Sequence, residues 1–148
     1  MRKLQSCAHS KHLIMYHIIF VPHYRKRLFI NQKFTQELKE QLLEISLKYD
    51  FEIETIEIET IEIDPLKPDH IHILLRSIPK LSRSMIVRVL KQESTIWMWI
   101  KWERYLKNFY FGTRKIWARR YFVSSVGNVS ADQVEKYLEQ QAQEVQSA

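Results

Sequence analysis

The sequence predicts an α+β fold of the ferredoxin-like or RNA-recognition-like kind. In that fold an antiparallel sheet in βαββαβ order carries two helices on one face, and here one more helix follows at the C-terminus. Short apolar and β-branched runs alternate with longer stretches of helical spacing in this order along the chain. The 148 residues include 45% hydrophobic and 12% aromatic side chains, which suits one compact core. We therefore expect a single domain over residues 1–148.

The first two elements are a strand and an amphipathic helix. Residues 13–21 form a short apolar run (LIMYHIIFV) that is rich in β-branched side chains, and Pro22 ends it. A basic turn follows at residues 24–27 (YRKR). Apolar side chains then recur at near-helical spacing from Phe34 onward, which predicts a helix over about residues 32–49.

An acidic tract at residues 52–63 contains the unit EIETI twice in succession, followed by EID. Its β-branched content predicts a strand. A five-residue repeat cannot keep the two-residue alternation of a strand, because Ile56 and Ile58 share one face whereas Ile61 and Ile63 share the other. We therefore expect a β-bulge in this strand. The tract by itself suggests no function.

The second half of the chain begins with the return strand of a hairpin. Residues 69–76 (DHIHILLR) predict this strand, and an antiparallel connection from the acidic strand is the simplest one. Residues 81–107 are helical by content, with Ser82 or Ser84 as the N-cap.

The last two elements are a strand and a helix. Residues 117–126 (WARRYFVSSV) predict the strand. The S-x-x-Q capping box at residues 130–133 opens a final helix that runs to about Val145. In this arrangement the face of the sheet away from the two packed helices is open to bind a ligand.

The charge distribution favours a polyanionic partner. The net charge is +6, but residues 37–69 hold 11 acidic and 3 basic side chains, whereas residues 76–120 hold 12 basic and 2 acidic ones. Clustered Lys and Arg attract phosphates, although a solvated basic surface would have the same composition. Cys7 is the only cysteine, which fits a reducing cytoplasm. No apolar run of roughly 18 residues and no secretory signal is evident, so we expect no membrane association.

The H-x-H pair at residues 70–72 is the strongest chemical signal. Side chains alternate along a strand, so His70 and His72 point to one face about 7 Å apart while Ile71 points to the core. Two neutral imidazoles at that spacing can bind one cation. Asp69 could orient one of the rings or attract the cation. The spacing alone leaves two interpretations open, a metal site or two histidines on a solvated face.

The final helix could complete such a site. Tyr137 and Gln141 are four residues apart and therefore lie on one helical face, which the apolar Val134 and Leu138 flank. A tyrosine in that position is more often part of the core. Together with the H-x-H pair, however, the set contains a nucleophile, a third metal ligand in the amide oxygen, and a cation.

These residues carry a resemblance to a known family. KPDHIHILL resembles the HUH motif (histidine, hydrophobic, histidine) of the single-tyrosine transposases of the smallest bacterial and archaeal insertion sequences. The segments MYHIIFVPHYRKRLF, LKQES and WARRYFVSSVGNVSADQVEKYLEQQ resemble the opening strand and basic turn, the central helix, and the closing strand and tyrosine helix of that family. The resemblance covers roughly residues 16–141 in the family's order.

The resemblance implies a function for the four positions. His70, His72 and Gln141 would bind a divalent metal, Mg²⁺ or Mn²⁺, and Tyr137 would be the nucleophile that forms a 5′-phosphotyrosine and releases a 3′-OH. Imidazole ligands alone would instead favour zinc, copper or nickel. The resemblance also implies single-stranded DNA with hairpin-bearing element ends as the substrate. It further implies a homodimer with composite active sites.

Three features depart from the family's pattern. The doubled EIETI unit makes its strand longer than usual, which leaves the geometry of the hairpin before His70 in question. His23 stands where Lys is common before the Tyr-Arg pair, and Arg120 stands where Gly often precedes Tyr-Phe-Val. Both of these substitutions affect expected DNA contacts, and none of the three departures touches the four catalytic positions.

Basic and aromatic side chains are interleaved in the second half of the chain, a composition that suits the backbone and bases of unpaired DNA. We also expect half or more of the aromatic residues in 97–110 to be buried, in the core or in a subunit interface. The basic side chains that we expect to contact DNA are Arg25, Lys26, Arg27, Arg83, Arg88, Lys91, Arg119 and Arg120.

Three alternative functions share some of these sequence features. A histidine-triad nucleotide hydrolase would need a third alternating histidine, and position 74 is Leu. A domesticated repeat-processing nickase or a replication-initiator-like endonuclease would use the same chemistry without transposition. A catalytically idle nucleic-acid-binding module would carry aromatic side chains on the middle strand, where His70 and His72 stand instead.

Overall fold

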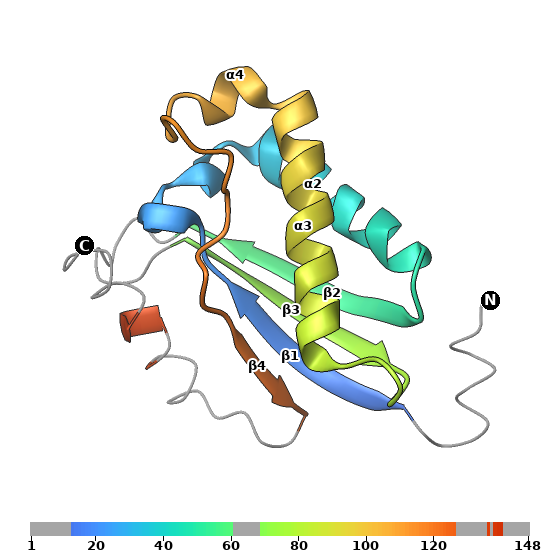
Figure 1. Cartoon of the computed structure of the whole chain (residues 1–148). Helices are drawn as coiled ribbons and strands as arrows, with labels where there is room; N and C mark the ends of the chain where they lie inside the picture. The colour runs from blue at the N-terminus through green and yellow to red at the C-terminus, as the bar shows by residue number, and fades with distance from the viewer. Residues whose placement is uncertain (1–12, 61–68, 127–135, 137, 141–148) are drawn as a thin grey trace.

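The computed structural model describes residues 13–60, 69–126, 136 and 138–140. Four strands form one antiparallel sheet in the order β2-β3-β1-β4, and two long helices cross the same face of it (Figure 1). This confirms the predicted α+β fold. The strands are β1 (Ile14–Phe20), β2 (Phe51–Glu59), β3 (His70–Ser77) and β4 (Phe122–Ser125), and the helices are η1 (His23–Arg25), η2 (Leu28–Ile30), α2 (Gln32–Leu47), α3 (Arg83–Lys101) and α4 (Glu103–Leu106).

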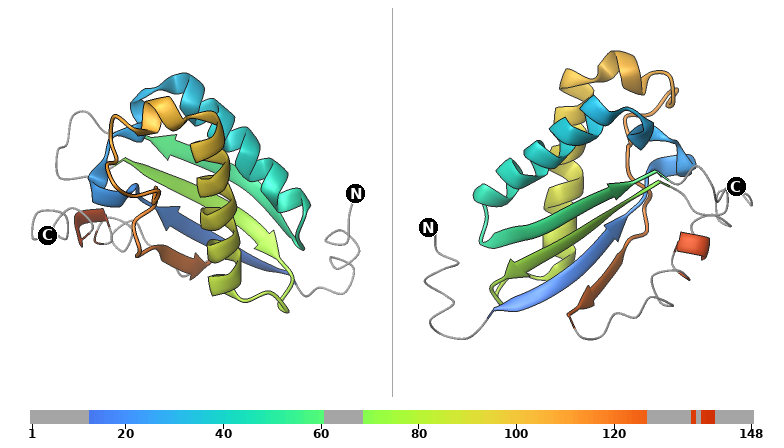
Figure 2. Two further views of the ribbon diagram at one scale, coloured as in Figure 1. Left: turned by 45° about the horizontal axis from the view of Figure 1, so that its top comes forward. Right: turned by 180° about the vertical axis from the view of Figure 1, so that it is seen from behind.

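The core lies between the sheet and helices α2 and α3. Alternate residues of the two central strands enter it, so Ile18 of β1 and Ile73 of β3 are fully buried. Helix α2 supplies Phe34, Leu38 and Leu42, which lie four residues apart and are also fully buried. Each of these side chains contributes roughly 1.5–3 kcal/mol through burial. The further views in Figure 2 show both long helices on this one side.

The opposite side of the sheet, which we call the histidine face, carries His17 of β1 together with His70 and His72 of β3. Residues of β1 alternate, so Ile19 points to this face, where it is fully buried. Leu138 packs with Ile19 and Val21 in a small apolar cluster that is separate from the main core. Part of the C-terminal region therefore covers the histidine face.

Strand β2 contains a bulge, as the acidic tract predicted, but it lies before the isoleucine pairs on which that prediction was based. Its register against β3 shifts between Ile53 and Thr55, so that Glu54 is the additional residue. Beyond the shift, Ile56 and Ile58 return to the side of the main core and pack against it. The bulge therefore keeps the isoleucines of the first repeat unit, and the first isoleucine of the second, on one face. Residues 61–63 of the tract lie outside the described residues.

The predicted helix over residues 81–107 is two helices. Ser82 is the N-cap of α3, as expected, because its hydroxyl accepts a hydrogen bond from the Met85 amide at 3.1 Å. The helix ends before Trp102, whose backbone leaves helical geometry (φ −122°, ψ 27°). Tyr105 then donates its hydroxyl hydrogen to the Leu28 carbonyl at 2.6 Å, and this contact anchors α4 near η2. The spacing of apolar residues along the sequence did not predict this tertiary contact.

Strand β4 is shorter than predicted, since the expected strand began at Trp117. Pairing with β1 covers only residues 122–125, and Trp117 forms a single isolated bridge with Pro22. Between them, the carbonyls of Ala118 and Arg119 accept hydrogen bonds from the Lys91 ammonium group of α3, while the Ala118 amide still donates to the Val21 carbonyl just after β1 at 2.8 Å.

The C-terminal helix is described only in part. Lys136 and residues 138–140 are helical, whereas the capping box at residues 130–133 lies outside the described residues. Within the part of the chain that the structure describes, none of the helices is long and apolar enough to span a bilayer.

Candidate metal and nucleic-acid site

The H-x-H pair lies on the histidine face, as the strand alternation predicts. His70 is 7% exposed and His72 is half-buried. The direct antiparallel partner of His72 is Ile19, which packs against Leu138. The pair is therefore not on an openly solvated surface, which was the alternative interpretation of the spacing.

A third imidazole reaches the pair from the neighbouring strand. His17 Nδ1 lies 2.8 Å from His72 Nε2, and the two rings share one proton in a hydrogen bond. Their centroids are 4.9 Å apart. Sequence reasoning missed His17. The alternation of β1 places it on the face of Ile19, but the contact depends on the register of β1 against β3, in which His17 stands opposite Leu74.

The electrostatic surroundings keep His72 neutral. Burial lowers the pKa of the His72 imidazole below its ordinary value, and the neighbouring His17 lowers that pKa further, while Glu57 opposes both effects. A neutral imidazole has the lone pair that a metal requires. The local environment therefore favours the form of His72 that can act as a ligand.

Carboxylates of β2 stand directly across from both histidines. The register pairs Glu57 with His72 and Glu59 with His70. Directly opposed residues of an antiparallel pair point to the same face. The Glu59 Oε2 atom lies 3.5 Å from His70 Nε2, and the side chain of Glu59 is 54% exposed. The histidine face thus combines imidazole nitrogens with carboxylate oxygens.

Asp69 is buried and its carboxylate holds the chain in place around the start of β3. One oxygen accepts a hydrogen bond from the Phe29 amide at 3.1 Å, and the other accepts one from the Thr60 hydroxyl at 2.7 Å. Burial raises the pKa of this carboxyl group, and the two hydrogen bonds counteract part of that rise. These contacts connect η2, the end of β2 and the H-x-H pair, whereas an orienting role toward an imidazole stays a prediction.

The donor types at this site fit a divalent cation. Two imidazoles and an exposed carboxylate are groups that first-row metals bind, and a carboxylate adds affinity for Mg²⁺ and Mn²⁺. Among the described residues, no three His, Cys, Asp or Glu side chains already surround a common point. Gln141, the third ligand that the family resemblance implies, lies outside the described residues, as does Tyr137, the expected nucleophile.

The basic turn at residues 25–27 follows β1 directly. Tyr24 and Arg25 both adopt left-handed backbone geometry, with φ of 58° and 53°. That geometry costs roughly 1–2 kcal/mol for each residue with a side chain. All three basic side chains of the turn are half-buried, so the turn is a constrained structure and not a loose loop.

The other expected DNA-contacting residues lie on or beside α3. Arg83, Arg88, Arg119 and Arg120 are exposed, whereas Lys91 is half-buried with its ammonium group bound to backbone carbonyls. A hollow of about 580 Å³ lies between α3 and residues 114–121. Its lining combines basic and aromatic side chains, among them Arg88, Lys91, Arg114, Lys115, Trp117 and Tyr121.

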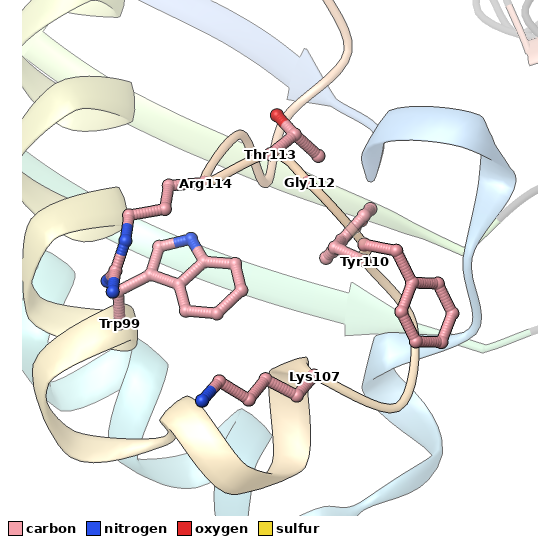
Figure 3. A pocket seen from close by; sticks show the side chains of 7 residues that line it. Trp99, Lys107, Tyr110, Gly112, Thr113 and Arg114 are labelled. Atoms are coloured by element: carbon pink, nitrogen blue, oxygen red, sulfur yellow. The ribbon is translucent and has the colours of Figure 1, made fainter.

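Two of the six aromatic residues in the 97–110 region are buried, Trp99 and Tyr110, which is fewer than the half or more that the sequence predicted. The other four pack against the core while partly exposed. Figure 3 shows a second hollow of about 520 Å³, in which the Trp99 indole lies beside the side chain of Arg114. The guanidinium carbon of Arg114 is 5.2 Å from the Trp99 ring centroid. Neither of these two hollows is lined by His70 or His72.

Comparison with known sequences gives one consistent result. The family model described as IS200-like transposase matches residues 10–141. The transposase of insertion sequence element IS200 from Salmonella typhimurium strain LT2 is 30% identical over 142 residues, which cover 95% of this chain and 84% of the relative. The ISDra2 transposase TnpA of Deinococcus radiodurans is 26% identical over 126 residues, which cover 85% of this chain and 82% of the relative.

Solved structures share the fold. A crystal structure from Deinococcus radiodurans R1, assigned as a transposase, matches with a TM-score of 0.71 at 23% identity and covers 87% of this chain and 91% of that one. A REP-associated tyrosine transposase bound to a REP hairpin matches with a TM-score of 0.51 at 14% identity, covering 84% of this chain and 62% of that one. At these identities the structural matches support the fold alone.

Proposed function

Because the chain belongs to the IS200-like, single-tyrosine transposases of the HUH superfamily, we propose that it cuts and rejoins single-stranded DNA with Tyr137 as the nucleophile and a divalent metal as the cofactor. The transposase family is established by the match over residues 10–141. The tyrosine chemistry, the metal and the form of the DNA are the proposal.

One observation carries the proposal. Leu138, the residue after Tyr137 in the sequence, is buried against Ile19 and Val21 on the histidine face. Ile19 is also the direct strand partner of His72. Leu138, next to Tyr137 in the sequence, thus packs against the strand partner of a proposed metal ligand, which supports the proposal.

The reaction follows from the groups that the chain contributes. The Tyr137 oxygen attacks the phosphorus of a phosphodiester, a new O–P bond forms, and the bond to the 3′ oxygen breaks. The phenol loses its proton to water and the departing 3′ oxygen takes one up, so the products are a 5′-phosphotyrosine and a 3′-OH. Attack by a 3′-OH of another end reverses these steps and releases the tyrosine, so no nucleotide is hydrolysed.

His70 and His72, together with Gln141, would hold the metal. A bound divalent cation would polarise the phosphoryl group and stabilise the departing oxygen. The protein's part is to hold both imidazoles in place and to keep that of His72 neutral. Burial lowers the pKa of His72, and the strand register fixes the position of both rings.

The substrate that we propose is a single-stranded element end that bears a hairpin, bound by a homodimer with composite active sites. The exposed basic residues beside α3 and the basic turn after β1 support binding to phosphates. One relative of the same fold was solved bound to a REP hairpin, which supports this class of ligand.

The test is covalent capture of a labelled single-stranded end oligonucleotide in the presence of Mg²⁺. The wild-type chain should give a protein–DNA adduct that survives denaturation, and Tyr137→Phe should give none while binding the oligonucleotide with nearly the same affinity. Tyr121→Phe is the matched control, because Tyr121 is half-buried and lies on the α3 side of the sheet. An adduct that persists in Tyr137→Phe, or cleavage that proceeds in chelator, would contradict the proposal.

A further inference from the structure

The acidic tract of β2 has no part in the reaction proposed above. Its position is nevertheless specific, because the bulge at Glu54 sets which side chains of the tract face the histidines. Beyond the bulge, Glu57 and Glu59 alternate with isoleucines that pack on the main core. The bulge therefore directs two carboxylates toward the proposed metal site and keeps the apolar side chains away from it.

Of the two carboxylates, Glu59 is the one in contact with a proposed ligand. Its Oε2 atom lies 3.5 Å from His70 Nε2, a distance beyond that of a good hydrogen bond. An ion pair with one half-exposed partner contributes little to stability, typically 0–1 kcal/mol. Stabilisation of the fold is therefore a weak explanation for this carboxylate beside a buried imidazole, and its exposed side chain has room to rotate toward an ion.

From this geometry we infer that Glu59 is a carboxylate donor of the metal site and works with His70 and His72. The inference rests on the proposed function, since it concerns the same metal. Hard divalent cations such as Mg²⁺ and Mn²⁺ prefer oxygen ligands, whereas imidazoles alone favour zinc, copper and nickel. A glutamate oxygen directly across from His70 supplies the ligand type that the two histidines lack.

Glu57 provides the internal comparison. It faces the same side of the sheet, opposite His72, and carries the same charge two residues away. The His72 Nε2 atom, however, already contacts His17. If the tract only attracts cations through its field, neutralising either glutamate has a similar effect. If Glu59 donates an oxygen to the metal, the two substitutions differ.

The experiment measures binding of Mn²⁺ alone to the full chain by isothermal titration calorimetry, with the electron paramagnetic resonance signal of Mn²⁺ as a second readout. Glu59→Gln should weaken Mn²⁺ binding by roughly tenfold or more, with a smaller loss for Zn²⁺, since both imidazoles remain. Glu57→Gln should stay within about threefold of the wild type. Glu54→Gln is a distant control on the same strand, where the carboxylate pairs with Arg76 at 2.7 Å. Thermal unfolding in chelator checks that each variant is folded.

An unchanged Mn²⁺ affinity in Glu59→Gln, or an equal loss in Glu57→Gln, would overturn the inference. In either case the covalent-capture assay with wild-type protein still reports on the proposed function, so the two can fail separately. A wild-type chain that does not bind Mn²⁺ would overturn the inference together with the metal requirement of the proposed function.

Discussion

The half-buried ammonium group of Lys91 predicts in which direction the free energy of unfolding changes with pH. Its ammonium group is half-buried between α3 and the segment before β4, where it donates hydrogen bonds to the carbonyls of Ala118 at 2.7 Å and Arg119 at 3.3 Å. It also lies 5.5 Å from the centroid of the Tyr121 ring. Burial lowers the pKa of Lys91 from its ordinary 10.5 to about 8. The perturbation is Lys91→Met, which keeps most of the length of the side chain and removes the charge.

The magnitude follows from proton linkage. The pKa of Lys91 is lower in the folded chain than in the unfolded chain, so below pH 8 the buried charge lowers the free energy of unfolding by its full amount. This destabilisation is relieved as the pH rises from about 8 toward 10.5. One proton corresponds to at most about 1.4 kcal/mol per pH unit. Between pH 7.5 and 9.5 the wild type should gain about 1–2 kcal/mol of unfolding free energy relative to Lys91→Met, after allowance for partial solvent exposure.

The assay is urea unfolding of both proteins at several pH values in this window. The hydrogen bonds lost in Lys91→Met shift the two curves by a constant amount, so only the change of their difference with pH is diagnostic. Burial raises the pKa of Tyr105 to about 12 and also raises that of Tyr110, and both tyrosines are common to the two proteins. A difference that is constant with pH, or that falls as the pH rises, would refute the reasoning.

Three further predictions concern the site and its supports. Asp69→Ala should lower the free energy of unfolding by about 2–3 kcal/mol because the buried Phe29 amide and the half-buried Thr60 hydroxyl lose their acceptor, and Asp69→Asn should lose less; equal losses would contradict this account. His17→Phe should cost about 1 kcal/mol and shift the ¹⁵N resonances of the His72 ring in chelator, whereas unchanged resonances would mean that the two rings are not bonded in solution. Arg119→Gln should weaken binding of single-stranded DNA and reduce the slope of log affinity against log salt by about 0.7 in magnitude; an unchanged slope would remove Arg119 from the DNA contacts.

Local sequence patterns predicted the fold and the shared face of the two histidines in the candidate site. The two-residue alternation of β3 placed His70 and His72 on one face. The five-residue period of the acidic tract predicted a bulge, and the one observed, at Glu54, lies before the isoleucine pairs on which that prediction was based. Both predictions follow from backbone geometry alone. The same is true of the Ser82 cap, where a hydroxyl satisfies a backbone amide of the first turn of the helix.

Contacts between distant segments could not be predicted in the same way. The approach of His17 to His72 depends on how two strands are aligned, and no residue in either strand encodes that alignment by itself. Likewise, the hydrogen bonds from Lys91 of α3 to the carbonyls of the segment before β4 join parts of the chain that are far apart in the sequence. The position of Leu138 on the histidine face is a third example, since an apolar residue in an amphipathic helix can pack on either side of a sheet.

Because the EIETI unit is repeated, the length of the β2–β3 hairpin can differ while the same kinds of side chain stay on each face of the sheet. A chain without residues 57–61 would still have Glu, Ile and Asp at the positions now held by Glu57, Ile58 and Glu59, because the remaining residues continue with EID. The side chains packed on the core would be unchanged up to that point, and an acidic group would still stand across from His70. The connection to β3 would be five residues shorter, and Pro65 would take the position of Thr60, so the hydrogen bond from Thr60 to Asp69 would be lost. This chain could therefore lose one whole unit without any change in the register of β2 against β3.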